Sequence, residues 1–307
     1  MCDVNQTEVT EFLLLGFKGL YKYKFLLFIL FFFCYMIILA GNLLIIVLVS
    51  TNHNLNTPMF YFLKHLAVAD ILSTTTIVPM MLNVILYDMK EVPVWSCIFH
   101  FHMVFIFGFN PFFLISVMSY DRYLAICRPM HYNSIMQPHV CFKMVLGSWF
   151  LNFVFSFEVI LVWRLKFCGN NTIDHFFCDF ELLLDLATSD TYLLTLVNFV
   201  IAIIGGVIPF ALVLISYLSI FFIIMILSST SGLSKVFSTC GSHLTTVCIY
   251  YGTLFMVYMP LSNDTSSSTN KFLSLLYILV TPMMNPIIYS LRNKEIRRTL
   301  QQMFRKC

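Results

Sequence analysis

The side chains best suited to chemistry are an acid and two amides inside long apolar stretches. Asp70 lies within residues 57–86, and Asn42 and Asn285 lie in apolar stretches far from it along the chain. An ionisable group in such a setting is costly and needs internal hydrogen-bond partners. We predict that Asn42, Asp70 and Asn285 form a polar lock between helices, acting either as a structural network or as a conformational relay.

A second candidate is the acid and base that close another apolar stretch, Asp121-Arg122-Tyr123. Arg122 can pair with Asp121 in one state and be released in another, which is the chemistry of a switch. The same pair can also be an ordinary solvated salt bridge at a helix end. The residues alone leave both interpretations open.

Catalysis and metal binding have little support. Ser238, Cys240 and His243 are the nearest approach to a nucleophile with a base. The sequence contains no Cys-x-x-Cys pair and no His-x-x-x-His pair that would suggest a structural zinc site. We expect no enzyme activity, no metal and no cofactor.

The elements that must position these groups are membrane-spanning helices. Of the 307 residues, 59% are hydrophobic and 11% are charged, and the mean hydropathy is +0.86, which excludes an ordinary water-soluble fold. The net charge of +3 is too small to indicate a nucleic-acid partner. Seven stretches are long enough to cross a bilayer as helices. They are residues 25–49, 57–86, 97–127, 140–162, 191–227, 235–261 and 271–292.

The predicted fold is therefore an all-α membrane protein, a seven-transmembrane helix bundle that forms a single domain over residues 1–307. A basic segment follows the last span. It is expected to form a short amphipathic helix at the C-terminus, residues 293–304, that lies on membrane lipid.

Charges and sequons predict the orientation. With the N-terminus outside, 11 of the 15 acidic residues fall in outer segments and 11 of the 18 basic residues fall on the inner side. This asymmetry follows the positive-inside rule. Sequons at Asn5, Asn170 and Asn263 also fall outside, and we predict glycosylation at Asn5. No cleavable signal peptide is evident before the first span.

Most of the ten cysteines lie in or near the spans and are expected to be small buried apolar residues. Cys97, Cys168 and Cys178 fall on the outer side. A bridge between Cys97 and Cys178 would close a loop of about 80 residues and pin the long outer loop over the bundle. We predict this disulfide.

Motifs throughout the chain resemble those of the rhodopsin-like G-protein-coupled receptors, and among them the odorant receptors. The motifs are Gly41-Asn42, residues 58–63 (PMFYFL), residues 118–127 (MSYDRYLAIC), Ser216-Tyr217, residues 235–244 (KVFSTCGSHL), Tyr251-Gly252-Thr253 and residues 282–293 (PMMNPIIYSLRN). The segment that ends the third span is the most characteristic. Chance agreement at so many ordered positions is negligible.

The resemblance implies an odorant receptor, with no catalysis, in the plasma membrane of sensory cilia. Its C-terminus would lie in the cytoplasm, and it would activate a stimulatory olfactory G protein and raise cyclic AMP. The upper sixth span lacks a cationic residue, which resembles the receptors for volatile apolar odorants rather than those that capture carboxylates. Activation and G-protein coupling are assigned to Asp121, Arg122, Tyr123, Tyr217, Asn285, Pro286 and Tyr289.

We predict the ligand site from helical spacing on the third and sixth spans and from alignment of the motifs elsewhere. The residues are Val104, Phe105, Gly108, Phe109, Ser156, Val159, Asn198, Ile201, Ala202, Tyr251, Leu254, Phe255, Tyr258, Leu275 and Ile278. Most are apolar, so burial of a small molecule supplies the binding energy. One or two hydrogen bonds from Ser156, Asn198, Tyr251 or Tyr258 would orient it.

The chain departs from the family pattern at three positions. Pro111 stands where the family has a glutamate, which argues against a sodium site near Asp70 and predicts a kink in the third span. Thr188 stands where the outer loop usually has a cysteine, so Cys168 is expected to lack its usual partner. Met80 follows Pro79 where the family has a lysine.

A transporter or channel is the main alternative, since the same intramembrane acid and amides could line an ion path. That class predicts paired broken helices or an internal repeat. Neither is visible in the sequence.

Overall fold

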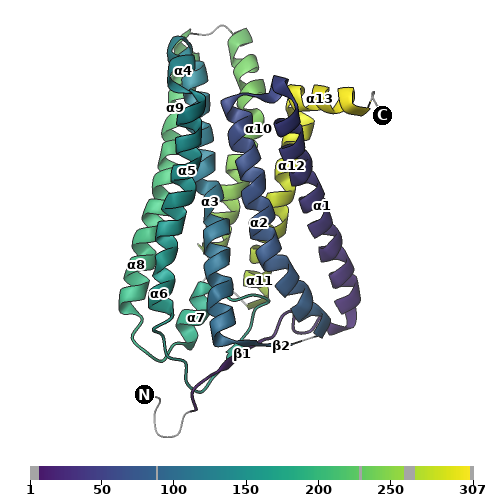
Figure 1. The fold of residues 1–307 in the computed structure, drawn as a ribbon, viewed down its shortest axis with the longest axis vertical. Coiled ribbons are helices and arrows are strands. Elements are labelled where there is room, and N and C mark those ends of the chain that lie inside the picture. The colour runs from purple at the N-terminus through teal and green to yellow at the C-terminus, as the bar shows by residue number, and fades with distance from the viewer. Residues whose placement is uncertain (1–6, 88, 228–229, 259–266, 305–307) are drawn as a thin grey trace.

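The computed structural model describes residues 7–87, 89–227, 230–258 and 267–304, and its long helices lie side by side in a bundle (Figure 1). The bundle helices are α1 (Lys24–Thr51), α2 (Pro58–Tyr87), α3 (Val94–Cys127), α5 (Pro138–Phe155), α8 (Tyr192–Ala202), α9 (Ile208–Leu227), α10 (Thr230–Tyr258), α11 (Ser267–Leu275) and α12 (Thr281–Arg292).

Three of the spans are built from consecutive segments. The 3-10 turn η3 (Ser156–Glu158) and α6 (Val159–Val162) extend α5, and π-helical turns η4 (Ile203–Val207) and η5 (Leu276–Val280) join α8 to α9 and α11 to α12. Proline follows each π turn closely, at Pro209 and Pro282. A proline lacks the N–H that the regular ladder needs, so a local change of helical pitch is physically expected there. Each of the seven predicted spans overlaps one of these helices or helix runs over the residues that the structure describes.

The two ends of the bundle differ (Figure 1). One end, here called the tail end, carries α4 (Pro129–Ile135) and α13 (Lys294–Phe304), and the turn η2 (His53–Leu55) packs against α13. The other end, here called the sheet end, carries α7 (Phe180–Leu186), the turn η1 (Tyr21–Tyr23) and three short strands. The helix expected at residues 293–304 is α13, which lies across the tail end of the bundle.

Six helices in the described residues are long and apolar enough to cross a membrane. They cover residues 21–51, 58–87, 94–127, 138–162, 192–226 and 269–290. α10 is not among these six, and its first half is rich in serine and threonine. It nevertheless packs against α3, α9 and α12 inside the bundle. The helical membrane fold predicted from hydropathy is therefore confirmed.

The sheet end contains a small sheet that hydropathy did not predict. β1 (Glu11–Leu14) pairs antiparallel with β2 (Lys90–Pro93) and parallel with β3 (Thr172–Ile173), in the order β2-β1-β3. Phe12 and Leu14 are fully buried. The three consecutive apolar residues Phe12 to Leu14 are too short a run to identify a strand, and the partners of β1 lie far along the chain.

The bundle permits a close approach of α1 to α12. A Cβ atom built on Gly41 would lie 2.8 Å from Cγ of Pro286, so glycine is needed there. Because Pro286 has no N–H, the carbonyl of Pro282 loses its usual helical donor. Asn42 supplies the missing donor, with its Nδ2 3.1 Å from that oxygen. α3 continues through Pro111, and the predicted kink there stays a prediction.

The predicted disulfide between Cys97 and Cys178 is confirmed, with the two Cα atoms 5.6 Å apart. It joins the start of α3 to the long loop before α7. Cys168 lacks its usual loop partner, as expected, because Thr188 stands at that position; it is nevertheless disulfide-bonded, so it is not a free cysteine.

Candidate functional site

A buried polar network lies between α2, α10 and α12. Tyr250 donates a hydrogen bond to Oδ1 of Asp70 at 2.5 Å, and Asn285 donates from Nδ2 to Oδ2 of Asp70 at 2.6 Å. Asn285 also lies 2.8 Å from the hydroxyl oxygen of Tyr250. All three side chains are at most 2% exposed. Both carboxyl oxygens are therefore satisfied without water, as an acid inside a membrane requires.

The network corrects one part of the predicted lock. Asn285 is a partner of Asp70 as predicted, whereas Asn42 donates to the carbonyls of Ile38 and Pro282. Tyr250 takes the place expected for Asn42. Tyr250 precedes Tyr251, and neighbouring helix positions point about 100° apart, so one can face α2 while the other faces α3. The adjacent pair of tyrosines, Tyr250 and Tyr251, was the feature of the sequence that could have identified Tyr250 as a partner of Asp70.

Arg122 is paired with Asp121 in this structure. Arg122 donates to Oδ2 of Asp121 from Nη2 at 2.5 Å and from Nε at 3.0 Å. Tyr132 of α4 donates to the other carboxylate oxygen of Asp121 at 2.8 Å. Asp121 is fully buried and the Arg122 side chain is 15% exposed. This is a shielded pair rather than a solvated one, and Tyr132 was not expected from the sequence.

Other predicted activation residues surround this pair on neighbouring helices. The Tyr217 hydroxyl on α9 lies 2.6 Å from Nδ1 of His243 on α10, and the two rings are stacked. Tyr289 on α12 is fully buried, and Tyr123 on α3 is partly buried. The contact between Tyr217 and His243 joins α9 to α10.

Aromatic rings connect three of the helices assigned to the ligand site. Phe105 stacks on Phe109 with centroids 4.7 Å apart, and Phe112 lies between Phe109 and Tyr251. Phe210 on α9 contacts Tyr251 at 4.7 Å. The predicted residues Phe105, Phe109 and Tyr251 thus belong to one continuous aromatic layer, in which Phe112 and Phe210 are additional members.

The remaining predicted ligand residues divide into groups. Phe105, Val159 and Ile201 share a buried cluster with the Cys97–Cys178 cystine, and Ile278 lies in a second cluster against which Val104 and Leu275 pack. Ser156 donates its hydroxyl to the carbonyl of Phe153 at 2.6 Å, so that proton is already used. Leu254 packs against the cluster that contains Tyr251.

Two predicted ligand residues face outward. Ala202 is exposed and Phe255 is 42% exposed, while Asn198 is partly buried. Because neighbouring helix positions point about 100° apart, Ile201 faces inward and Ala202 does not. The side chain of Tyr258 and the sequon residue Asn5 lie outside the described residues.

Gly108, a predicted ligand residue, contacts Tyr277 of the seventh span. Tyr277, in the π turn η5, donates its hydroxyl to the Gly108 carbonyl at 2.7 Å. A Cβ atom on residue 108 would lie 3.0 Å from that hydroxyl oxygen. The glycine therefore allows the seventh span to pack directly against α3, and Tyr277 is a neighbour of the predicted ligand residues that helical spacing on α3 could not identify.

Glu158 is a second residue that the sequence pattern did not single out. It lies in η3, which packs against α3 and α8, and it is 5% exposed. Among the described residues, neither of its carboxyl oxygens has a hydrogen-bond partner. A buried unpaired acid in a membrane helix is costly to keep without a function. Its neighbours Ser156 and Val159 are both predicted ligand residues.

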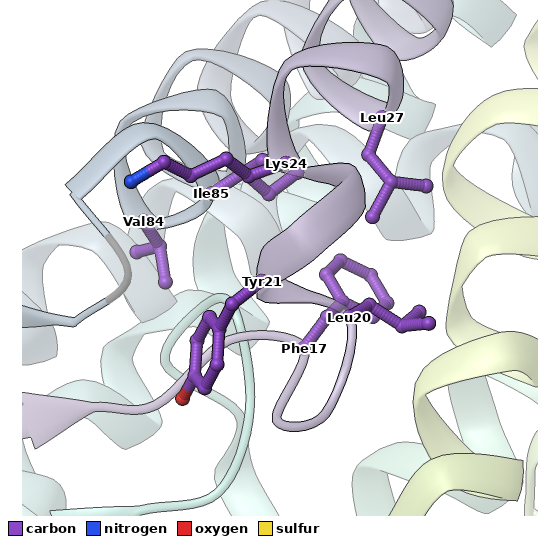
Figure 2. Close-up of a pocket in the computed structure, with 7 residues that line it drawn as sticks. All are labelled: Phe17, Leu20, Tyr21, Lys24, Leu27, Val84 and Ile85. Carbon is purple, nitrogen blue, oxygen red and sulfur yellow. The ribbon is translucent and has the colours of Figure 1, made fainter.

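A shallow surface hollow lies elsewhere, between the start of α1 and the end of α2. Figure 2 shows its lining side chains, with the Lys24 amine directed away from Leu27. The lining residues are Phe17, Leu20, Tyr21, Lys24, Leu27, Val84 and Ile85. The hollow is open to its surroundings and contains none of the predicted ligand residues, so we do not assign the predicted ligand to it.

A charged cluster covers part of the sheet end. Lys271 of α11 lies 2.7 Å from Oδ1 of Asp174, and Lys18 lies 3.9 Å from the same atom. Beside them His175 is 5% exposed and packs against the rings of Phe176 and Phe177. Burial, with a smaller effect from Lys271, lowers the pKa of His175 to about 3, so the folded protein keeps this ring neutral.

The buried His175 predicts a pH dependence of stability. Below about pH 6.5 the His175 ring binds a proton in the unfolded chain but stays neutral in the folded chain. The contribution of His175 to the free energy of unfolding therefore falls by about 1.4 kcal/mol per pH unit as the pH decreases towards 3. Glutamine does not titrate, so the stability of His175→Gln should decrease less steeply than that of the wild type as the pH falls. The measurement is the apparent melting temperature of both proteins in detergent at pH 7.5 and 5.5. Parallel shifts in the two proteins would contradict the prediction.

Comparison with known proteins gives consistent matches over almost the whole chain. The sequence profile of the family described as "Olfactory receptor" matches residues 31–307. Olfactory receptor 7C1 of Homo sapiens is 43% identical over 297 residues, which cover 96% of this chain and 93% of the relative. Olfactory receptor 1E16 of Mus musculus is 40% identical over 307 residues, which cover 100% of this chain and 98% of the relative. The crystal structure of squid rhodopsin matches with a TM-score of 0.74 at 19% identity, over 92% of this chain and 81% of that chain.

Proposed function

Because the chain belongs to the olfactory receptor family, we propose that it binds small volatile odorants between its helices and activates a stimulatory olfactory G protein, which raises cyclic AMP. Olfactory receptors and rhodopsin-like G-protein-coupled receptors are signalling receptors and not enzymes. The observation that carries the proposal is the shielded pair of Arg122 and Asp121, which can open when α10 moves.

In this proposal the sheet end faces the outside and the tail end faces the cytoplasm. The charge asymmetry of the sequence and the Cys97–Cys178 disulfide at the sheet end support this orientation. The receptor would be a multi-pass protein of the plasma membrane in sensory cilia. Residues 1–307 would act as one receptor domain, and Asn5 would carry a glycan.

The ligand would lie among α3, η3, α8, α10 and the seventh span. The aromatic layer and the two buried clusters supply apolar contact, at about 25 cal/mol per Å² of buried apolar area. Contact with α10 near Tyr251 would favour a state in which the tail end of α10 moves outward. That movement separates Tyr217 from His243 and frees Arg122 for the last helix of the G protein.

We expect Glu158 to recognise hydrogen-bond donors on the odorant, since its unpaired oxygens can only accept when ionised. Glu158→Gln should reduce potency about tenfold for odorants that carry a hydroxyl or amine, which corresponds to about 1.4 kcal/mol. Ketones and esters without a donor should keep their potency. The measurement is cyclic AMP in cells that co-express the olfactory G protein, across a panel of volatile compounds.

The matched control is Glu181→Gln, which neutralises an exposed acid in α7. It should change no dose–response curve. Equal loss for donor and non-donor odorants in Glu158→Gln would contradict a direct ligand contact. No response of the wild-type receptor to any compound, despite surface expression, would contradict the proposed function itself.

A further inference from the structure

Tyr277 lies where three helices meet. It belongs to the π turn η5 of the seventh span, and its hydroxyl donates to the Gly108 carbonyl of α3 at 2.7 Å. A Cβ atom built on residue 108 would lie 3.0 Å from that hydroxyl oxygen and 3.8 Å from Oγ of Ser73 on α2. The junction is therefore too tight to accept one added carbon atom unless Tyr277 shifts.

Predicted ligand residues lie on both sides of this hydrogen bond. Gly108 is itself one of them, and Val104 lies one helical turn before it on α3. Ile278 follows Tyr277 directly and belongs to a buried cluster against which Val104 and Tyr277 both pack. An odorant bound among these residues would press directly on the contact between Tyr277 and Gly108.

The π turn η5 is joined to the buried polar network around Asp70 by threonine hydroxyls. Thr281 donates to the carbonyl of Leu276 at 3.3 Å, which is the i to i−5 spacing of a π turn. Its hydroxyl oxygen also lies 3.4 Å from that of Thr253 on α10, and Thr253 donates to the carbonyl of Tyr250 at 3.0 Å. Tyr250 in turn donates to Asp70, so η5 and the network belong to one connected set of contacts.

The seventh span also enters the network directly. Asn285 lies about two helical turns after Tyr277 and donates to Oδ2 of Asp70 at 2.6 Å. The span is thus held at two levels, to α3 through Tyr277 and to α2 through Asn285. Because η5 continues into α12 without a break, a displacement at Tyr277 is carried to Asn285.

We propose that Tyr277 is a positioning residue that stabilises the resting arrangement through its hydrogen bond to Gly108, and that odorant binding releases this bond and favours the signalling arrangement. This inference rests on the proposed function, in which the paired state of Arg122 and Asp121 is the resting arrangement. A bond made in only one of two arrangements shifts the equilibrium towards that arrangement, and its loss shifts the equilibrium back.

The first test removes only the hydroxyl, in Tyr277→Phe. Loss of one neutral hydrogen bond should raise the population of the signalling arrangement about threefold to tenfold. Basal cyclic AMP, measured without odorant and normalised to surface receptor, should rise. Volatile alcohols, amines, ketones or esters that activate the wild type should act at lower concentrations. Unchanged or lower signalling per receptor would overturn the proposal, because a merely structural bond would change only the amount of receptor.

Tyr35→Phe is the matched control. Tyr35 on α1 donates its hydroxyl to Oγ1 of Thr75 on α2 at 3.1 Å, so this variant also loses a single hydroxyl bond between two helices. Neither residue belongs to the predicted ligand site or to the network around Asp70, so basal signalling per receptor should stay at the wild-type level. An equal rise in Tyr35→Phe would mean that loss of any such helix contact activates the receptor, and the specific role of Tyr277 would be rejected.

Gly108→Ala tests the contact from its other partner. The added methyl group would lie 3.0 Å from the Tyr277 hydroxyl oxygen and should displace it, so basal signalling per receptor should rise. Absence of a rise would overturn the proposal, even if Tyr277→Phe did not reach the cell surface. In the double variant that oxygen is missing, so alanine should add little to the effect of Tyr277→Phe. Two effects that simply multiply would mean that the residues act independently, which contradicts the proposal.

A measurement without G protein separates this inference from the proposed function. Amide hydrogen exchange is compared between purified wild type and Tyr277→Phe in detergent, without odorant. We expect faster exchange in the variant around Tyr217 and His243, where α9 and α10 are joined, because the arrangement that separates them is populated more. Equal exchange would overturn the inference. Faster exchange in a receptor that raises no cyclic AMP would support the role of Tyr277 and contradict only the proposed G-protein coupling.

Discussion

Replacing Arg122 with alanine is expected to abolish odorant-stimulated cyclic AMP while receptor delivery to the cell surface continues. The guanidinium is the group that the closed pair withholds and that the proposed open state presents to the G protein. Folding should tolerate the change, because Asp121 keeps the hydrogen bond from Tyr132. The measurement is cyclic AMP with the olfactory G protein, normalised to the amount of receptor at the surface.

Lys143→Ala provides the control for this experiment. It removes an exposed basic residue near the start of α5. Signalling should persist in this variant, which would show that loss of positive charge alone does not explain the effect of Arg122→Ala. Full signalling in Arg122→Ala would reject the proposed role of the pair, and a receptor lost from the surface would show that the pair acts mainly in folding.

Replacing Asp70 with alanine should remove most receptor from the cell surface. The carboxyl group accepts from Tyr250 and Asn285 in a site with no access to water. Without it, buried donors lose their acceptor, at a cost of about 2 to 5 kcal/mol. That cost is a large fraction of the stability of a typical domain. Surface labelling and the melting temperature of the purified receptor measure the loss.

Two further variants define the cause. Asp70→Asn keeps a side chain of the same shape and an oxygen that can accept from Tyr250, so its loss should be smaller than that of Asp70→Ala. Asp185→Ala removes an exposed acid in α7 and should have no effect. Normal surface level and normal melting temperature in Asp70→Ala would contradict a structural role for the network.

The helical membrane fold and the family could be predicted from the sequence. Runs of apolar residues without charges are a local property, and they identify membrane helices wherever they occur. The motif around Asp121, Arg122 and Tyr123 is equally local. The outer positions of Cys97 and Cys178 could also be predicted from the sequence, and the structure confirms that these two cysteines are paired.

Only the tertiary structure decided which polar groups meet. Asp70 is 180 residues from Tyr250 and 215 residues from Asn285, and the lock includes Tyr250 in place of Asn42. The contact depends on which helix faces meet, and a single sequence does not contain the rotation of each helix about its axis. The same reason applies to Tyr277 on Gly108 and to the buried, unpaired Glu158. Sequence composition determines that a helix enters the membrane, whereas packing between helices determines which of its side chains find a partner.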